Sequence, residues 1–200
     1  ERRLANHADA WFARAKAAAL DSLPCRLGCH QCCIGPFAIT VLDVARLHAG
    51  LSAIPRPRSR GIRSRAAAMV ADVERIYPRL ATAPFLDDWA DAEIDRLVTD
   101  FQDRSCPALE DDGTCGIYDW RPLTCRLMGV PAENDGLVHG ACQVQTSVPI
   151  VRQSEILRQD EERLAQGEAA ALQAFRQFTG TTGEEVLLPY GFVGERMDRG

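Results

Sequence analysis

The stretch Cys25-Arg-Leu-Gly-Cys29-His-Gln-Cys32-Cys33 contains four of the eight cysteines of this 200-residue chain. Spacings of two and three residues allow a turn to bring cysteine sulfurs together on one ion, about 2.3 Å from a bound zinc. The neighbouring side chains of Cys32 and Cys33 tend to diverge. We therefore expect them to bind different ions or different irons of a cluster, unless one of them is not a ligand. This cluster predicts a metal-holding loop around which the fold is built.

The second half of the chain carries the other four cysteines in a stretch with no sustained helical period. Residues 105–145 contain prolines, glycines and an Asp112-Gly113 turn, which predict loops. Thiolates at this density select zinc, copper(I) or iron–sulfur clusters over magnesium or calcium. Eight thiols suffice for two four-thiolate sites. The predicted metal ligands are Cys25, Cys29, Cys32, Cys33, Cys106, Cys115, Cys125 and Cys142.

Two histidines lie close enough to these cysteines in the sequence to replace a sulfur. His30 lies inside the first cluster, and His139 precedes Cys142 by three residues. We favour ordinary solvated or hydrogen-bonded side chains for both.

A site of four thiolates is anionic, so cations and N–H donors are needed around it. Arg26 and Arg126 each follow a cysteine directly, and Arg121 lies four residues before Cys125. We expect these three arginines to surround the metal-binding cysteines, with ordinary surface arginines as the alternative.

Three apolar or aromatic side chains between Cys115 and Cys125 are candidates for covering the site. Ile117 and Tyr118 are predicted to pack over it and exclude water, with Trp120 as an apolar wall. Ordinary core packing is the alternative for all three.

The rest of the chain predicts a mostly α fold, a small helical domain wrapped around cysteine-rich, metal-holding loops with little or no sheet. Residues 55–64, rich in arginine and proline, predict an exposed connection, and residues 186–190 a strand or an extended strap. We expect a single domain over residues 1–200, with a cysteine core at about 25–142. Apolar periodicity predicts helices at residues 4–20, from a Thr40 cap to a stop at Gly50, at 65–80, at 86–101 and at 150–178 before Gly180.

Composition excludes several classes of protein. Apolar residues make up 46% of the chain and charged residues 26%, as in ordinary globular proteins, and no apolar run reaches the length of about 18 residues that a membrane span needs. The net charge of -5 argues against a globally basic nucleic-acid-binding protein. Because the chain opens on an amphipathic stretch without the pattern of a secretory signal, we expect it in the cytoplasm.

The cysteine pattern as a whole resembles the YkgJ / CxxCxxCC cysteine-cluster family, whose members are described as zinc- or iron-chelating proteins. The match covers roughly Cys25 to Cys142 and departs in having three residues between Cys25 and Cys29. The resemblance implies metal binding through these cysteines, and some relatives with similar patterns resemble flagellin lysine methylases thought to carry an iron–sulfur cluster. The residues that carry it are Cys25-x3-Cys29-x2-Cys32-Cys33, Cys106-Pro107-Ala-Leu109, Asp112-Gly113-x-Cys115-x-Ile117-Tyr118 and Arg121-Pro122-x-x-Cys125-Arg126.

Several functions fit this pattern. The first is a protein holding an iron–sulfur cluster, [4Fe-4S], or zinc, and Cys106-Pro107 is a hint toward iron. The second is a metal-dependent enzyme modifying a protein or peptide, methylase-like or redox, although nucleotide-binding loops and metalloprotease motifs are absent. The third is a zinc-stabilised interaction module with an unidentified protein partner, in which residues 56–65 contact RNA, an acidic protein or a lipid surface. The fourth, structural disulfides in an exported protein, conflicts with the missing signal pattern and with the adjacent Cys32 and Cys33, because disulfides between neighbouring cysteines are strained.

Overall fold

The computed structural model of the protein describes residues 2–18, 28–130, 132–134, 137–139 and 154–193. Helices dominate these residues, whose strands form just two short two-stranded sheets, so the predicted mostly α fold is confirmed. The chain divides into two compact units. We call them the first unit, Glu1–Cys32 with Leu123–Ala171, and the second unit, Cys33–Pro122 with Leu172–Gly200.

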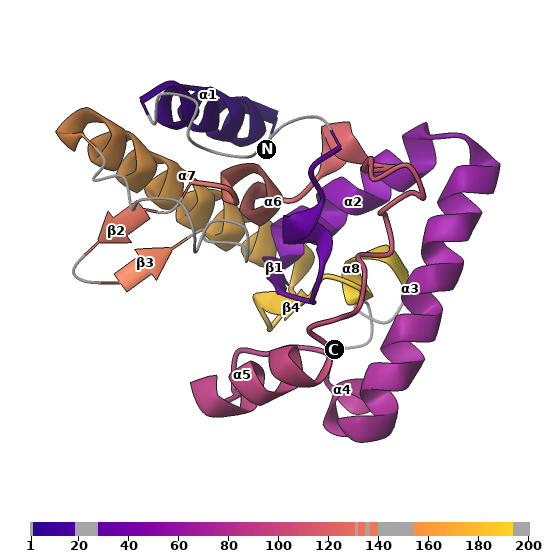
Figure 1. Ribbon diagram of the computed structural model, residues 1–200. Coiled ribbons are helices and arrows are strands. Elements are labelled where there is room, and N and C mark those ends of the chain that lie inside the picture. The colour runs from indigo at the N-terminus through magenta and orange to yellow at the C-terminus, as the bar shows by residue number, and fades with distance from the viewer. Residues whose placement is uncertain (1, 19–27, 131, 135–136, 140–153, 194–200) are drawn as a thin grey trace. The chain divides into compact units, whose positions relative to one another are not determined.

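The first unit is built on three helices, which lie side by side in Figure 1. They are α1 (Arg2–Ala18), α6 (Leu123–Leu127) and the first part of α7 (Glu155–Thr179). The Trp11 side chain is 1% exposed, and its indole N–H donates to the Leu157 carbonyl oxygen at 3.1 Å. The amphipathic helix predicted for the opening segment is therefore confirmed. Its buried indole N–H is satisfied by a hydrogen bond where α1 meets α7.

A short hairpin belongs to the same unit. Its strands, β2 (Ala132–Asn134) and β3 (Leu137–His139), pair antiparallel. It falls inside the stretch for which the sequence predicts loops.

The second unit contains the other sheet, in which β1 (Ala38–Thr40) and β4 (Glu185–Leu187) pair antiparallel. Residues 186–190, predicted as a strand or a strap, thus form strand β4 and lead into helix α8 (Tyr190–Val193). Because β4 comes from the end of the chain, this pairing closes the unit around its core. The largest buried cluster of the second unit lines this pairing and the adjoining helices, and includes Ile39, Leu47, Ile62, Val73, Leu86, Ile117, Leu187 and Phe192.

Helix α2 (Val41–Ala53) begins where the sequence predicts. The hydroxyl oxygen of Thr40 accepts the Asp43 backbone N–H at 3.3 Å, which satisfies one of the helix's otherwise unpaired N-terminal donors. The predicted stop at Gly50 is wrong, because the helix continues to Ala53. Gly50 serves close packing instead: a Cβ atom there would lie 2.5 Å from the Trp120 Cβ atom.

Helix α3 (Arg56–Ile76) includes the residues predicted as an exposed connection, so that prediction was wrong. The two prolines lie at the N-terminus, where a helix does not need their N–H groups, and therefore do not interrupt it. Ile62 and Ala66 are fully buried on one face of α3 and anchor this arginine-rich half to the core.

The remaining helices differ from prediction at their ends. The helix predicted at residues 65–80 divides between α3 and the short α4 (Arg79–Thr82). The helix predicted at 86–101 begins later, as α5 (Asp91–Asp100), because the Leu86 N–H donates to Glu185 of β4 at 2.9 Å. Helix α7 ends as predicted before Gly180, whose φ of +73° suits glycine. No helix within the described ranges has the length and apolar character that crossing a membrane requires.

Candidate metal centre

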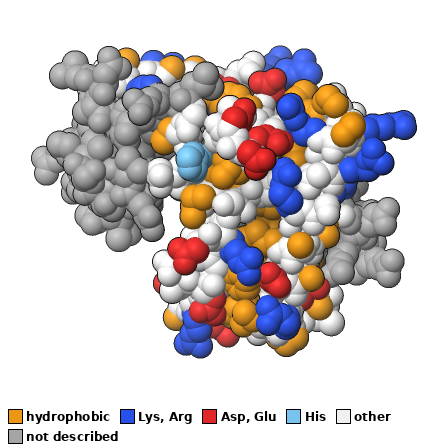
Figure 2. Space-filling model, turned by 45° about the vertical axis from the view of Figure 1, so that its right-hand side comes forward, with side chains coloured by type: hydrophobic (Ala, Val, Ile, Leu, Met, Phe, Trp, Pro, Cys, Tyr) orange, Lys and Arg blue, Asp and Glu red, His pale blue; other side chains and the backbone are white. Residues whose placement is uncertain are grey.

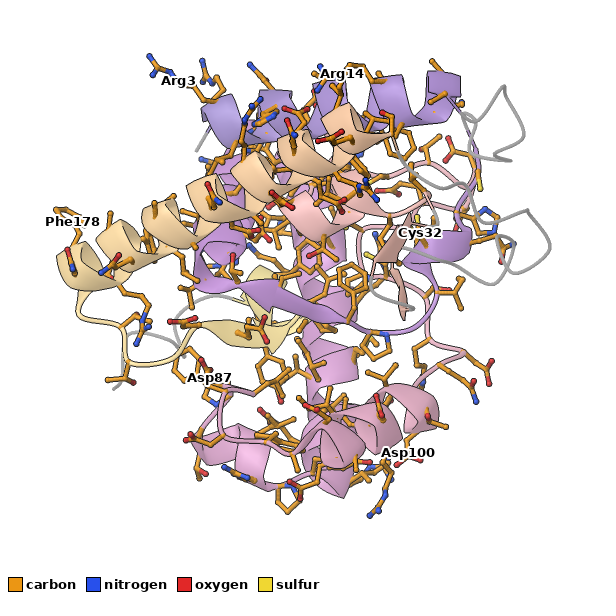
Figure 3. The ribbon with its side chains drawn as sticks, turned by 90° about the vertical axis from the view of Figure 1, so that its left-hand side faces the viewer. Arg3, Arg14, Cys32, Asp87, Asp100 and Phe178 are labelled. Atoms are coloured by element: carbon orange, nitrogen blue, oxygen red, sulfur yellow. The ribbon has the colours of Figure 1, made fainter. Side chains whose placement is uncertain are left out.

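Six of the eight predicted cysteine ligands lie in the described part of the chain, while Cys25 and Cys142 lie outside it. All six are thiols with partly exposed side chains. The division between the two units falls between the adjacent Cys32 and Cys33. Cys32 is the last residue of the first segment of the first unit and lies on the short helix η1 (Gln31–Cys33), as labelled in Figure 3. The first unit contains Cys29, Cys32 and Cys125, and the second contains Cys33, Cys106 and Cys115.

Cys33 and Cys106 meet through their backbones in the second unit. The Cys106 N–H donates to the Cys33 carbonyl oxygen at 2.7 Å, and Ile34 and Ser105 form an antiparallel bridge beside them. The Gly35 N–H extends this ladder to the Arg104 carbonyl oxygen at 2.8 Å. Backbone pairing therefore brings Cys33 of the first cluster to Cys106 of the second, a contact that their separation in the sequence did not predict.

Cys106 and Cys115 belong to one hairpin. The Leu109 N–H donates to the Cys106 carbonyl oxygen at 2.9 Å, closing a turn, and Leu109 then bridges to Cys115. The predicted Asp112-Gly113 turn is confirmed at the tip, where Gly113 has a φ of +80° and the Asp112 carboxylate accepts the Thr114 N–H at 2.9 Å. The hydrogen bonds from Thr114 also hold the pKa of Asp112 below its usual value.

The sulfur of Cys106 accepts a hydrogen bond from the backbone. The Ala108 N–H lies 3.4 Å from Cys106 Sγ, across Pro107. N–H donors of this kind offset the negative charge of a metal-bound thiolate and adjust the properties of the metal. The carbonyl oxygen of Pro107, on the same peptide group, accepts from Arg65 Nε at 2.8 Å.

Arg65 is a residue that our sequence analysis did not select. It lies on α3, at the first residue of the helix predicted at 65–80, and its guanidinium also approaches the Glu110 carboxylate at 3.8 Å. The apolar periodicity of residues 65–80 already placed Arg65 on a helix. No local pattern, however, predicts its contact with the hairpin.

The predicted arginines have different surroundings. The Arg126 side chain, 3% exposed on α6, forms an ion pair with Asp9 of α1. The Arg121 guanidinium lies over the Tyr118 ring at 3.8 Å and donates to the Tyr118 carbonyl oxygen at 3.1 Å. Arg26 lies outside the described residues.

Two of the three side chains predicted to cover the site pack in the core, as their alternative interpretation has it. Ile117 is buried in the core, and the half-buried Trp120 packs against Gly50. Tyr118 was expected to exclude water, but its side chain is 58% exposed, and its ring is stacked under the Arg121 guanidinium. His30 Nδ1 lies 3.2 Å from the Gly28 carbonyl oxygen, an ordinary hydrogen bond for a histidine in a turn.

The donor chemistry fits a soft metal, because thiols on turns and a backbone N–H directed at a sulfur are features of zinc and iron–sulfur sites. Within the ranges that the structure describes, no three His, Cys, Asp or Glu side chains form a group that could hold an ion. The predicted set of eight ligands also includes Cys25 and Cys142, which lie outside the described residues.

Comparison with known proteins gives one family. No curated protein and no solved structure matches the chain. A family model matches residues 24–143, more than half of the chain, from just before Cys25 to just after Cys142. The chain therefore belongs to the CxxCxxCC family, which is described as a "Putative zinc- or iron-chelating domain".

Proposed function

We propose that the chain binds an iron–sulfur cluster or zinc through its eight cysteines, with Cys33 and Cys106 serving one site. The observation that carries the proposal is the Cys106 turn, in which a backbone N–H donates to the sulfur while the peptide of Cys106 pairs with Cys33. Thiols in such turns are poor partners for hard ions such as magnesium and good ones for zinc and iron. The family description supports the same two metals.

Of the two metals we favour iron, as a [4Fe-4S] cluster. The Cys106-Pro107 pair is similar to the last cysteine of bacterial ferredoxin motifs, and the N–H donor at Cys106 Sγ suits an anionic cluster. Either metal would cross-link the cysteine-bearing loops. Bound iron would in addition allow electron transfer. We place the protein in the cytoplasm, whose reducing conditions keep clustered thiols available as ligands.

The three arginines then have distinct roles in the proposal. Arg126 holds α6, the helix of Cys125, against α1 through Asp9. Arg121 and Arg26 supply positive charge close to Cys125 and Cys25 in the sequence, which an anionic site requires.

The test is elemental analysis with a visible spectrum, on protein purified without oxygen and without a metal-affinity column. Cys106→Ser is compared with the wild type and with Ser105→Ala, which changes the preceding residue but removes no sulfur. We expect stoichiometric metal in the wild type and in Ser105→Ala, and a lower content in Cys106→Ser. Iron and acid-labile sulfide in near-equal amounts, with brown absorbance, would identify an iron–sulfur cluster. Colourless protein that contains zinc would identify a zinc site. A wild type without metal, or Cys106→Ser with full content, would overturn the proposal.

A further inference from the structure

The peptide group between Pro107 and Ala108 is hydrogen-bonded at both of its polar ends. Its carbonyl oxygen accepts from Arg65 Nε at 2.8 Å, and its N–H donates to Cys106 Sγ at 3.4 Å. A side chain of helix α3 is thus joined to a predicted ligand sulfur through a single peptide unit.

A guanidinium hydrogen-bonded to a carbonyl oxygen polarises the peptide group and strengthens the N–H of the same peptide as a hydrogen-bond donor. Charge-assisted hydrogen bonds are stronger than neutral ones, and hydrogen bonds in a chain polarise one another. The Ala108 N–H therefore becomes a better donor to Cys106 Sγ when Arg65 is in place. The same contact also restricts the rotation of the peptide plane, which keeps the N–H directed at the sulfur.

Arg65 is itself held in position by the hairpin. Its Nη2 atom lies 3.8 Å from Glu110 Oε1, a buried oxygen. Gly116 leaves the room for this carboxylate, because a Cβ atom at Gly116 would lie 2.3 Å from Glu110 Oε1. Ala66, the next residue of α3, is fully buried and fixes the helix beneath Arg65.

From these contacts we propose that Arg65 is a positioning residue for the metal site, acting on Cys106 through the Pro107–Ala108 peptide. The inference rests on the proposed function, since it requires that Cys106 binds metal. Arg65 touches the backbone and not the sulfur, so it adjusts the strength with which metal is held and does not bind it.

The same helix offers a matched control. Arg58 has a similar exposure, 53% against 47% for Arg65, and its Nε atom also lies 3.8 Å from Glu110 Oε1. The two arginines therefore share a helix, a charge and an acidic partner. Of the two arginines, Arg65 is the one that donates to the Pro107 carbonyl oxygen. Figure 2 shows acidic and basic side chains next to one another on the face that includes α3.

The experiment compares full-length wild type, Arg65→Gln, Arg65→Lys and Arg58→Gln. Zinc affinity is measured by competition with a chromophoric chelator, and the sulfur-to-cobalt charge-transfer absorption is recorded at saturating Co²⁺. We expect Arg65→Gln to weaken zinc binding about tenfold, the lower end of the effect of removing outer partners of metal ligands. Its cobalt absorption should shift as well. Arg65→Lys should fall between Arg65→Gln and the wild type, because lysine keeps the charge and a donor but not the guanidinium geometry.

The outcomes separate this inference from the proposed function. A wild type that takes up neither zinc nor cobalt would overturn both. A wild type that binds zinc, with Arg65→Gln matching Arg58→Gln in affinity and absorption, would overturn the role of Arg65 alone. The role of Arg65 is supported if zinc binding is weaker in Arg65→Gln but not in Arg58→Gln. Equal far-UV circular dichroism spectra of the metal-free variants would show that the weaker binding is not caused by a loss of folding.

Discussion

The backbone N–H of Cys106 donates to the carbonyl oxygen of Cys33 at 2.7 Å, joining two cysteines that belong to different clusters in the sequence. The bridge between Ile34 and Ser105 extends this contact into a short antiparallel ladder. Such pairing fixes where the two segments lie, so a metal at this place would bind to loops that are already positioned.

The first prediction concerns the number of metal sites. If Cys33 and Cys106 bind the same metal, Cys33→Ser and Cys106→Ser should each lower the metal content by the same amount. The double variant should lose no more than either single variant, because residues of one site are not additive. Metal per chain, measured by elemental analysis of each variant, tests this.

Cys32→Ser provides the comparison, since Cys32 belongs to the first unit. Combined with Cys106→Ser, it should lower the metal content further than either single change. Additive losses for Cys33 and Cys106 would show that they serve different metals.

The second prediction concerns the ion pair of Asp9 with Arg126. Asp9→Asn should lower the free energy of unfolding by about 1–2 kcal/mol. Removing one partner of a buried pair costs more than this, but Asp9 is 44% exposed and the pair is correspondingly screened. Urea unfolding followed by circular dichroism measures the change.

Arg14→Gln is the control for that prediction. Arg14 pairs with Asp160 from a side chain that is 52% exposed, so its loss should cost less than about 1 kcal/mol. Equal effects of the two substitutions would contradict the importance of burial at Arg126.

The third prediction concerns Gly50. A Cβ atom at this position would lie 2.5 Å from Trp120 Cβ and 3.0 Å from Ile117 Cδ1. Gly50→Ala should therefore destabilise the protein by about 1–3 kcal/mol, the usual cost of overpacking a core. Thermal and urea unfolding both report this loss.

Gly61→Ala provides the matched substitution on helix α3. The nearest atom to its Cβ would be Arg65 Nη1 at 3.5 Å, an ordinary contact. The change should stabilise the helix by about 0.5–1 kcal/mol, because alanine loses less backbone entropy than glycine. A change of the same sign at both positions would contradict the packing argument.

The fourth prediction concerns acid unfolding. A hydrogen bond from His7 and the charge of Arg14 hold the pKa of Asp160 below its usual value, against a smaller opposing effect of burial. A carboxyl whose folded pKa is lowered stabilises the protein above its unfolded pKa of about 3.9, and this stabilisation is lost as the pH falls through the folded pKa. Asp160→Asn should remove that part of the pH dependence. Urea midpoints measured from pH 6 to acid conditions test it.

Glu185→Gln should behave in the opposite way. Burial, together with the charges of Asp87 and Glu184, raises the pKa of Glu185, so its ionised form is unfavourable in the folded protein. The substitution should raise the stability at neutral pH. The gain should shrink as the pH falls through the raised folded pKa, and it should be absent below the unfolded pKa. A loss of stability at neutral pH would contradict this assignment.

Sequence periodicity and capping residues were sufficient to predict the elements whose signals are local in the sequence. Helices α1 and α7, the Thr40 cap of α2 and the Asp112-Gly113 turn lie where the sequence places them, because each depends on residues within one or two turns of one another. The candidate ligands were equally accessible to sequence analysis. Thiols at close spacing indicate metal chemistry without knowledge of the fold.

Contacts between distant residues were decided by tertiary structure alone. Arginine and proline content predicted a connection at residues 55–64, yet burial of Ile62 and Ala66 against the core outweighs that local preference and makes the segment from Arg56 onward helical. The Cys33–Cys106 hydrogen bond and the Arg65–Pro107 contact join segments far apart in the chain. The sequence alone determined which residues can bind a metal, whereas packing of the core determined which of them meet, because burial and backbone pairing depend on the whole chain.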